Sequence, residues 1–461
     1  MLAALVFLLL MVFGLLMRAA QGGLVALAPD LFYRILTVHG AGMVGTAGLS
    51  GAAIMWFFVN RHVPLSHAVY VAFLALFLAG VVSILGAVFA GGFAGAWTFL
   101  YPLPAVSGGA WDPLAAVVFL LGYVAIGVGF LLLHLDIGRA LISAWGSIPR
   151  ALGWPLVFGR GGEAPPPTVI AAMAVTIFNT IGIVVGAAVL ISSIVNLVFP
   201  GFAVDALLAK NMIYFFGHVF INASIYMAVI AVYEIVPEYT GMPWKATRLF
   251  AATWSVVLLF VMAVYPHHLL QDVPLPGWTM VVGQVLSYYS GIPVIAVTAW
   301  SLLVYLRRAQ SLAWDLPLAL LVLGVAGWSA GVVPAVIDAI VAVNRVMHNT
   351  LWVPGHFHTY LLLGEVAMAF GFLLRLAAGE RFRSFTGFDR TALVLYLAGG
   401  IGLVLTFLIS GAASIPRRFA VHLPDWQPLA LIGAVAASLT VAGALLVVLR
   451  ALSSPRAREA A

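Results

Sequence analysis

Six histidines in this sequence have the residue type and the spacing to hold metal ions. Two of them, His356 and His358, lie in the stretch HNTLWVPGHFH at residues 348–358. On an α-helix, residues two positions apart point about 200° away from each other, so one metal ion cannot bind both. Two cofactors could bind one each, because imidazole is the commonest metal ligand among side chains. The pair therefore predicts a metal-bearing cofactor on each side of one helix.

The elements that must position these histidines are membrane helices. The chain has 461 residues, of which 64% are hydrophobic and 8% charged. This composition excludes a soluble globular domain and predicts an all-α polytopic membrane protein, with residues 1–461 forming a single transmembrane catalytic domain. About twelve apolar runs are long enough to cross a bilayer, at residues 2–19, 36–58, 68–91, 113–134, 168–196, 211–236, 247–265, 279–305, 315–340, 348–374, 391–411 and 427–449.

The positive charges predict the orientation. Most of the 21 Lys and Arg residues follow the even-numbered runs, so the positive-inside rule places both termini in the cytoplasm. The net positive charge is therefore explained by the orientation in the membrane. It predicts contact with membrane lipid and does not indicate binding to nucleic acid. The sequence has no cysteine, which excludes disulfides, iron–sulfur clusters and thiolate-bound metal within this chain. Histidine nitrogen must then be the main metal ligand.

With this topology, six histidines from distant parts of the chain lie at a similar depth in the outer leaflet. A lone histidine in a membrane helix is more often a hydrogen-bonded packing residue than a ligand. Six of them at one depth favour metal binding. They are His39, His218, His267, His268, His356 and His358.

Four other residues are predicted at the outer rim of this layer. His348 is about 12 Å of helical rise from His356 if the helix runs that far, and Pro354 can interrupt it. Arg417 and Arg418 lie on the side where positive charge is otherwise scarce, as does Arg345. The guanidinium group binds carboxylates bidentately, so haem propionates are natural partners. Lipid phosphate or a solvated loop is the alternative.

Together these motifs resemble one family, subunit I of the haem–copper oxidoreductases, and most closely its B-type oxidases. The resemblance rests on LTVHG at residues 36–40, GH at 217–218, YPHHL at 265–269, HNTLWVPGHFH at 348–358 and IPRR at 415–418. It implies the subunit I fold and two haems with one copper ion. The implied ligands are His39 and His358 for a low-spin haem, His356 for a high-spin haem, and His218, His267 and His268 for copper. Arg417 and Arg418 would pair with propionates, near His348.

The sequence departs from this family where oxygen-reducing members carry a tyrosine. In those members the tyrosine lies one turn after the first copper histidine, or about six residues before the histidine pair. Here these positions hold Asn222 and Val261. Familiar nitric oxide reductases have glutamate at the first position, and asparagine cannot deliver a proton. Tyr226, one turn after Asn222, either replaces the missing phenol or is a packing residue in the helix bundle. Glu365, a membrane-embedded acid on the His358 face, is either a proton relay or a hydrogen-bonded buried side chain.

These departures favour a respiratory reductase that converts NO to nitrous oxide. The alternative is a terminal oxidase of the cytochrome c oxidase type that reduces oxygen to water. Dismutation of NO is a third possibility, because it uses similar cofactors. A haem transporter without redox turnover is a fourth, but it does not explain the three further histidines at the same depth. The chain has no CXXCH motif, so the resemblance implies a donor subunit bearing copper or haem c, or a cytochrome c or cupredoxin donor, with quinol also possible. The expected location is the inner membrane of a bacterial or archaeal cell.

Overall fold

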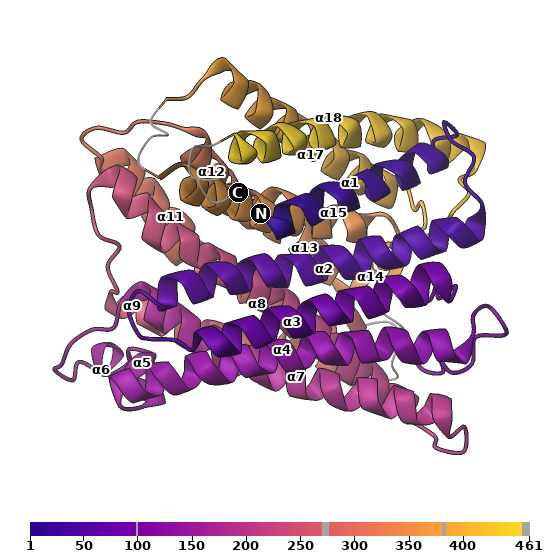
Figure 1. Cartoon of the computed structure of the whole chain (residues 1–461), viewed down its shortest axis with the longest axis horizontal. Coiled ribbons are helices and arrows are strands. Elements are labelled where there is room, and N and C mark those ends of the chain that lie inside the picture. Colours follow the sequence, from indigo (N-terminus) through magenta and orange to yellow (C-terminus); the bar gives the residue numbers. More distant parts are fainter. Residues whose placement is uncertain (98–99, 270–275, 380–383, 454–461) are drawn as a thin grey trace.

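The computed structural model describes residues 1–97, 100–269, 276–379 and 384–453, and these residues form an all-helical bundle (Figure 1). Twelve spans within them are long and apolar enough to cross a membrane, as the sequence predicts. The helices of the first half are α1 (Leu2–Gln21), α2 (Pro29–Val59), α3 (His67–Leu85), α4 (Pro113–Trp145), α5 (Ile148–Ala151), α6 (Trp154–Val157), α7 (Pro167–Val198) and α8 (Ala206–Thr240). Those of the second half are α9 (Arg248–Ala263), α10 (Gly277–Ser290), α11 (Ile292–Arg308), α12 (Leu316–Ala330), α13 (Val332–Ala339), α14 (Val341–Met347), α15 (Trp352–His358), α16 (Ala367–Ala378), α17 (Gly387–Ala412) and α18 (Gln427–Leu452).

Three spans form the middle of the bundle, and they carry four of the six histidines. Of the apolar stretch of α8, 83% is buried inside the protein, and the corresponding values are 78% for the span Trp352–Ala378 and 72% for α2. The span Gly277–Arg308 is only 18% buried and lies at the periphery. Figure 1 shows α1, α17 and α18 along one side of the bundle and α4 and α7 along the other.

Several spans are interrupted or end at positions that the apolar pattern does not predict. The tenth span begins at Trp352 and not at His348, because Pro354 fits the first turn of a helix, where a backbone N–H is not needed. It then changes into a π-helix, η3 (Thr359–Val366), before α16. The eighth and ninth spans break at Gly291 and Gly331, and α4 continues to Trp145, past the predicted end at 134.

The ligand-bearing helix α15 is held closely against α17. A Cβ atom on Gly411 of α17 would lie 2.0 Å from the backbone nitrogen of Trp352, a distance that no side chain tolerates. The Leu351 backbone N–H also donates to the carbonyl of Ile415, just after α17. Glycine at this position therefore sets how closely α15 approaches its neighbour.

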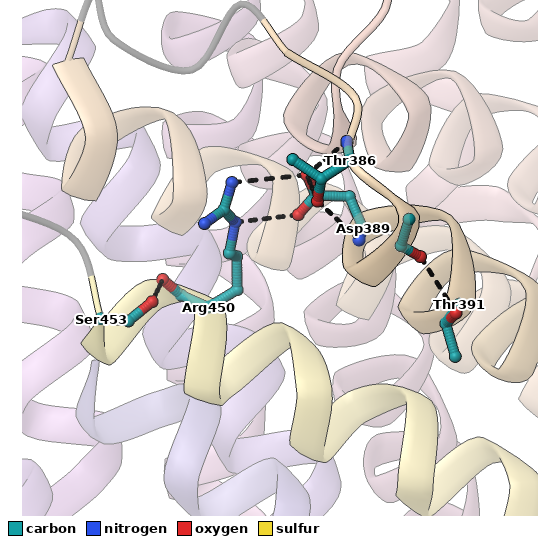
Figure 2. Close-up of polar contacts among 6 residues, drawn as sticks. Thr386, Asp389, Thr391, Arg450 and Ser453 are labelled. Atoms are coloured by element: carbon teal, nitrogen blue, oxygen red, sulfur yellow. Dashed lines mark hydrogen bonds and ion pairs between the residues drawn. The ribbon is translucent and has the colours of Figure 1, made fainter.

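The other end of α17 is fixed by a capping box and an ion pair (Figure 2). Thr386 and Asp389 cap the helix reciprocally, with Thr386 Oγ1 donating to Asp389 Oδ2 over 2.7 Å. Arg450 of α18 donates to Oδ1 of the same buried carboxylate at 2.9 Å. The Asp389 carboxylate thus caps the N-terminus of α17 and also links α17 to α18 through an ion pair.

Candidate metal centre

Three histidines from two elements come together as a compact nitrogen cluster. His218 lies on α8, whereas His267 and His268 lie on a short 3-10 turn, η2 (Tyr265–Leu269). One ligand atom from each lies within 4.8 Å of the others. Consecutive histidines can converge because α9 ends at Ala263 and Pro266 prevents a regular helix. The donor set, three imidazole nitrogens, suits copper.

A second pair of histidines faces each other across the middle of the bundle. The ring centroids of His39 on α2 and His358 on α15 lie 6.3 Å apart, with their planes 17° from parallel. A metal–nitrogen bond of about 2 Å on each side, together with the half-width of each ring, accounts for this separation. The pair therefore fits the axial positions of one haem iron.

His356 points to different neighbours from His358, as their spacing predicts. Its ring meets the Tyr360 ring edge to face at 4.9 Å, and its Nδ1 lies 3.2 Å from the Gly331 carbonyl oxygen. It also lies close enough to His218, His267 and His268 to interact with them electrostatically. His358 instead packs on Phe407 of α17. A haem bound by His356 would therefore be next to the copper triad.

Backbone carbonyl groups select the nitrogen that each haem-side histidine offers to a metal. Nδ1 of His39 lies 2.7 Å from the Leu10 carbonyl oxygen, and Nδ1 of His358 lies 2.7 Å from that of Pro354. A carbonyl oxygen only accepts hydrogen bonds, so each Nδ1 must carry a proton and donate it. The second nitrogen, Nε2, is then unprotonated and free to bind iron. His356, with its bond to Gly331, follows the same rule.

Asn222 is used to hold the copper-site histidine. Its Nδ2 donates to the backbone carbonyl of His218 at 2.8 Å and lies 3.1 Å from Nδ1 of the same ring. Tyr226 lies a turn further along α8, buried among the rings of Phe178, Trp254 and Trp328. These contacts favour the packing role that the sequence left open for Tyr226.

A different tyrosine, which the sequence reasoning missed, contacts the triad. The ring centroid of Tyr214 lies 5.5 Å from that of His268, with the planes 25° apart. Tyr214 precedes His218 by one turn on α8, whereas we looked for a phenol one turn after it. Residues four positions apart in either direction share a helix face, so the signal was available. The triad therefore has a phenol beside it.

The rim residues His348, Arg417 and Arg418 lie on two adjoining segments, because the Arg417 backbone N–H donates to the Asn349 carbonyl oxygen at 2.9 Å. His348 is almost fully buried, and its Nε2 lies 3.1 Å from the backbone oxygen of His268. Arg417 donates to Asn349 Oδ1 at 3.2 Å. Arg418 has a φ of +67°, which strains a non-glycine residue, and burial lowers the pKa of its guanidinium group. Arg345 is exposed, and among the described residues no hydrogen bond or ion pair joins it to this layer.

Arg18 is a further candidate, which entered the sequence-based prediction only through its charge. It is 4% exposed, lies inside the first span, and donates to Gln21 Oε1 at 2.8 Å. Its guanidinium carbon lies 4.8 Å from the centroid of Phe407, the ring that packs on His358. A buried arginine in a membrane span is a functional signal by itself, and this one is a single side chain away from the predicted low-spin haem ligand.

Known proteins match both the sequence and the fold. A family model described as "Cytochrome C and Quinol oxidase polypeptide I" matches residues 1–439. Quinol oxidase subunit 1 of Sulfolobus acidocaldarius is 23% identical over 90% of this chain and 80% of its own length. Cytochrome c oxidase subunit 1 of Thermus thermophilus is 25% identical over 49% of this chain, a match that spans only 43% of the relative. A solved heme-copper terminal oxidase dimer matches 98% of this chain and 84% of its own chain, with a TM-score of 0.74 and 20% identity.

Proposed function

Because the chain belongs to the family of cytochrome c and quinol oxidase polypeptide I, the catalytic subunit I of the haem–copper oxidoreductases, we propose that it reduces oxygen to water. Members of this family carry two haems and one copper ion, and the fold matches that of a terminal oxidase. The relatives named above are called oxidases. They support oxygen more strongly than the NO reduction that the sequence alone favoured.

The proposed ligands follow from the clusters described above. His39 and His358 hold the low-spin haem, His356 holds the high-spin haem, and the triad of His218, His267 and His268 holds copper. When bound, the copper and the high-spin haem iron would supply two redox metals for the reduction of a diatomic gas. The protein orients these ligands through the carbonyl groups of Leu10, Gly331 and Pro354.

The contact between Tyr214 and His268 is the observation that favours oxygen over NO as the substrate. Reduction of one oxygen molecule to two water molecules consumes four electrons and four protons. A phenol beside the site lends one electron and one proton together, and both are restored by the donor and by water. Tyr214 is the candidate for this role, because its ring centroid lies 5.5 Å from that of His268. Asn222 positions His218 and takes no part in proton transfer.

NO reduction remains the second candidate function because of one specific observation. The position one turn after His218, where the family's phenol is expected, holds Asn222, and its amide is hydrogen-bonded to His218 itself. Coupling two NO molecules into nitrous oxide and water needs two electrons and two protons, and no phenol. NO dismutation and haem transport have no observation of this kind in their favour.

The protein is a multi-pass membrane protein, and its electrons come from a partner. A donor subunit bearing copper or haem c, or a cytochrome c or cupredoxin, delivers electrons to the low-spin haem from the outer face. This face carries the rim layer of His348, Arg417 and Arg418, which we propose pairs with haem propionates. Direct oxidation of a quinol is the other route.

The test compares two gases on two forms of the purified, reduced complex. The wild-type complex is expected to consume oxygen rapidly on an oxygen electrode and NO slowly under anaerobic conditions. Tyr214→Phe keeps the stacked ring and removes only the hydroxyl group. We expect it to lower oxygen turnover by about a hundredfold or more, the typical contribution of a positioned proton donor, and to leave NO turnover unchanged.

The opposite pattern would establish the second candidate. Rapid NO consumption with nitrous oxide as product, and negligible oxygen uptake, would mean that Asn222 marks a true NO reductase. Rapid oxygen uptake that Tyr214→Phe leaves intact would keep the oxidase activity and remove Tyr214 from it. Tyr289→Phe on α10 is the control, because this tyrosine is exposed and has no proposed part in the chemistry.

A further inference from the structure

Glu365 is a carboxyl group buried completely in the middle of the bundle. It lies in the π-helix η3, which follows directly after His358, and its exposed fraction is 0%. Its Oε2 lies 3.0 Å from Oγ of Ser224 on α8, two residues after Asn222. Its Oε1 has no hydrogen-bond partner among the described residues. The group therefore lies between the helix that carries the copper-site histidine and the one that carries the haem ligands.

The surrounding backbone keeps this carboxyl group in place. A Cβ atom on Gly327 of α12 would lie 2.6 Å from the Leu363 carbonyl oxygen, so α12 seals one side of η3. Tyr396 of α17 donates to the Leu362 carbonyl oxygen at 2.5 Å, which satisfies a carbonyl group in the π-turn. π-Turns persist mainly at functional sites. Within this turn, Glu365 reaches Ser224 of α8.

The hydrogen bond to Ser224 reveals where the proton can lie. The Ser224 hydroxyl group has one hydrogen atom, and its oxygen is 2.8 Å from the Ile221 carbonyl oxygen as well as 3.0 Å from Glu365. A carbonyl oxygen only accepts, so when Ser224 donates to Ile221 the proton in the second bond must come from Glu365. When Glu365 is ionised, Ser224 turns and donates to it. The pair can thus hold Glu365 with or without its proton.

From this arrangement we infer that Glu365 is a proton relay that supplies the metal site from the cytoplasmic side. In each cycle the carboxyl O–H bond breaks, the proton passes to reduced substrate oxygen through water, and a proton from the cytoplasm restores it. An ionised carboxylate is costly in this setting, so the equilibrium favours return of the proton. The inference rests on the proposed function only in that the site consumes protons, which both oxygen and NO reduction do.

Glu365→Gln tests the relay, because glutamine has nearly the same shape and cannot carry the proton. The complex is reduced, loaded with carbon monoxide, and exposed to oxygen or NO after a flash, while a pH dye follows proton uptake. We expect uptake and steady-state turnover to fall by about tenfold or more. Both haem spectra and carbon monoxide binding should remain as in the wild-type complex. Glu163→Gln, in the exposed loop before α7, is the control and should change nothing.

Two further measurements keep the inference open to refutation if Glu365→Gln does not assemble. Ser224→Ala should slow proton uptake while leaving the haem and copper content unchanged. The infrared difference spectrum of the wild-type complex should show a protonated carboxyl band that changes on reduction and shifts in Ser224→Ala. Normal uptake in either variant, or a band insensitive to Ser224, would overturn the relay. The proposed function fails separately, if the wild-type complex does not reduce oxygen.

Discussion

At the scale of single residues, backbone carbonyl groups decide which histidine nitrogen is available to a metal. His39, His356 and His358 each have Nδ1 within hydrogen-bonding distance of a carbonyl oxygen. The remaining nitrogen, Nε2, is therefore fixed as the ligand atom before any cofactor binds. This preorganisation reduces the side-chain conformational entropy that is lost when a cofactor binds.

Removal of one triad ligand should affect copper and spare the haems. His218→Ala leaves His39, His356 and His358 untouched, because they lie on other helices. We expect the copper content of the purified complex to fall by at least about tenfold, since even outer-shell partners of a metal site cost that much. Metal analysis gives the copper to iron ratio, and the visible spectrum reports the haems.

The control for this prediction is His67→Ala, which removes an exposed histidine at the start of α3. It should leave the copper to iron ratio unchanged. A His218→Ala complex with full copper would mean that the triad is not the copper site.

The histidine sites could be predicted from the sequence, whereas their polar partners could not. Helical spacing and the order of the apolar spans can be read from the sequence, and together they predict that His39, His218 and His356 lie at one depth. The contact of Glu365 with Ser224 depends on a π-turn, which leaves no mark in the apolar pattern. Tyr214 was missed for another reason, because we looked for the phenol on only one side of His218.

At the scale of helices, close packing of α15 against α17 should control whether both haems bind. Gly411→Ala places a methyl group 2.0 Å from the Trp352 backbone nitrogen, and the backbone must move to accommodate it. Overpacking of this kind costs about 1–3 kcal/mol or more. Because α15 carries His356 and His358, we expect a lower midpoint of thermal unfolding and loss of haem absorbance.

Gly387→Ala, in the same helix, is the matched control. A Cβ atom at Gly387 would meet nothing within 4 Å, so this variant should unfold at the wild-type temperature and keep its haems. A Gly411→Ala complex that equals this control would show that α15 can shift without cost to the site.

The sequence predicts helices better than it predicts their interruptions. Apolar length alone identifies all twelve spans in the described residues, because the bilayer sets that length. The breaks at Gly291 and Gly331 occur inside apolar runs. Hydropathy is uniformly high there, so it does not distinguish a break from a continuous helix. The early predicted start at His348 had a similar cause, since residues 348–351 are as compatible with a helix as with the turn that the structure contains.

At the scale of the whole molecule, the distribution of positive charge predicts that both termini are cytoplasmic. A fluorescent protein fused after Ala461 should therefore fluoresce, because it folds in the cytoplasm and not after export. Alkaline phosphatase at the same position should be inactive. As a control, alkaline phosphatase fused after Gly201, in the connection between α7 and α8, should be active. The reverse pattern at both positions would invert the topology and place the histidine layer in the inner leaflet.

The facing pair of His39 and His358 has a consequence for the biosynthesis of the protein. One ligand belongs to the second span and the other to the tenth, and the carbonyl group that orients His39 belongs to Leu10 in the first. A ribosome must therefore release most of the chain before a complete haem site exists. Until then, His39 has no iron to bind. The first helices are already inserted in the bilayer at this stage. We expect haem insertion to be a late step of biogenesis, after which the haem holds the second and tenth spans together.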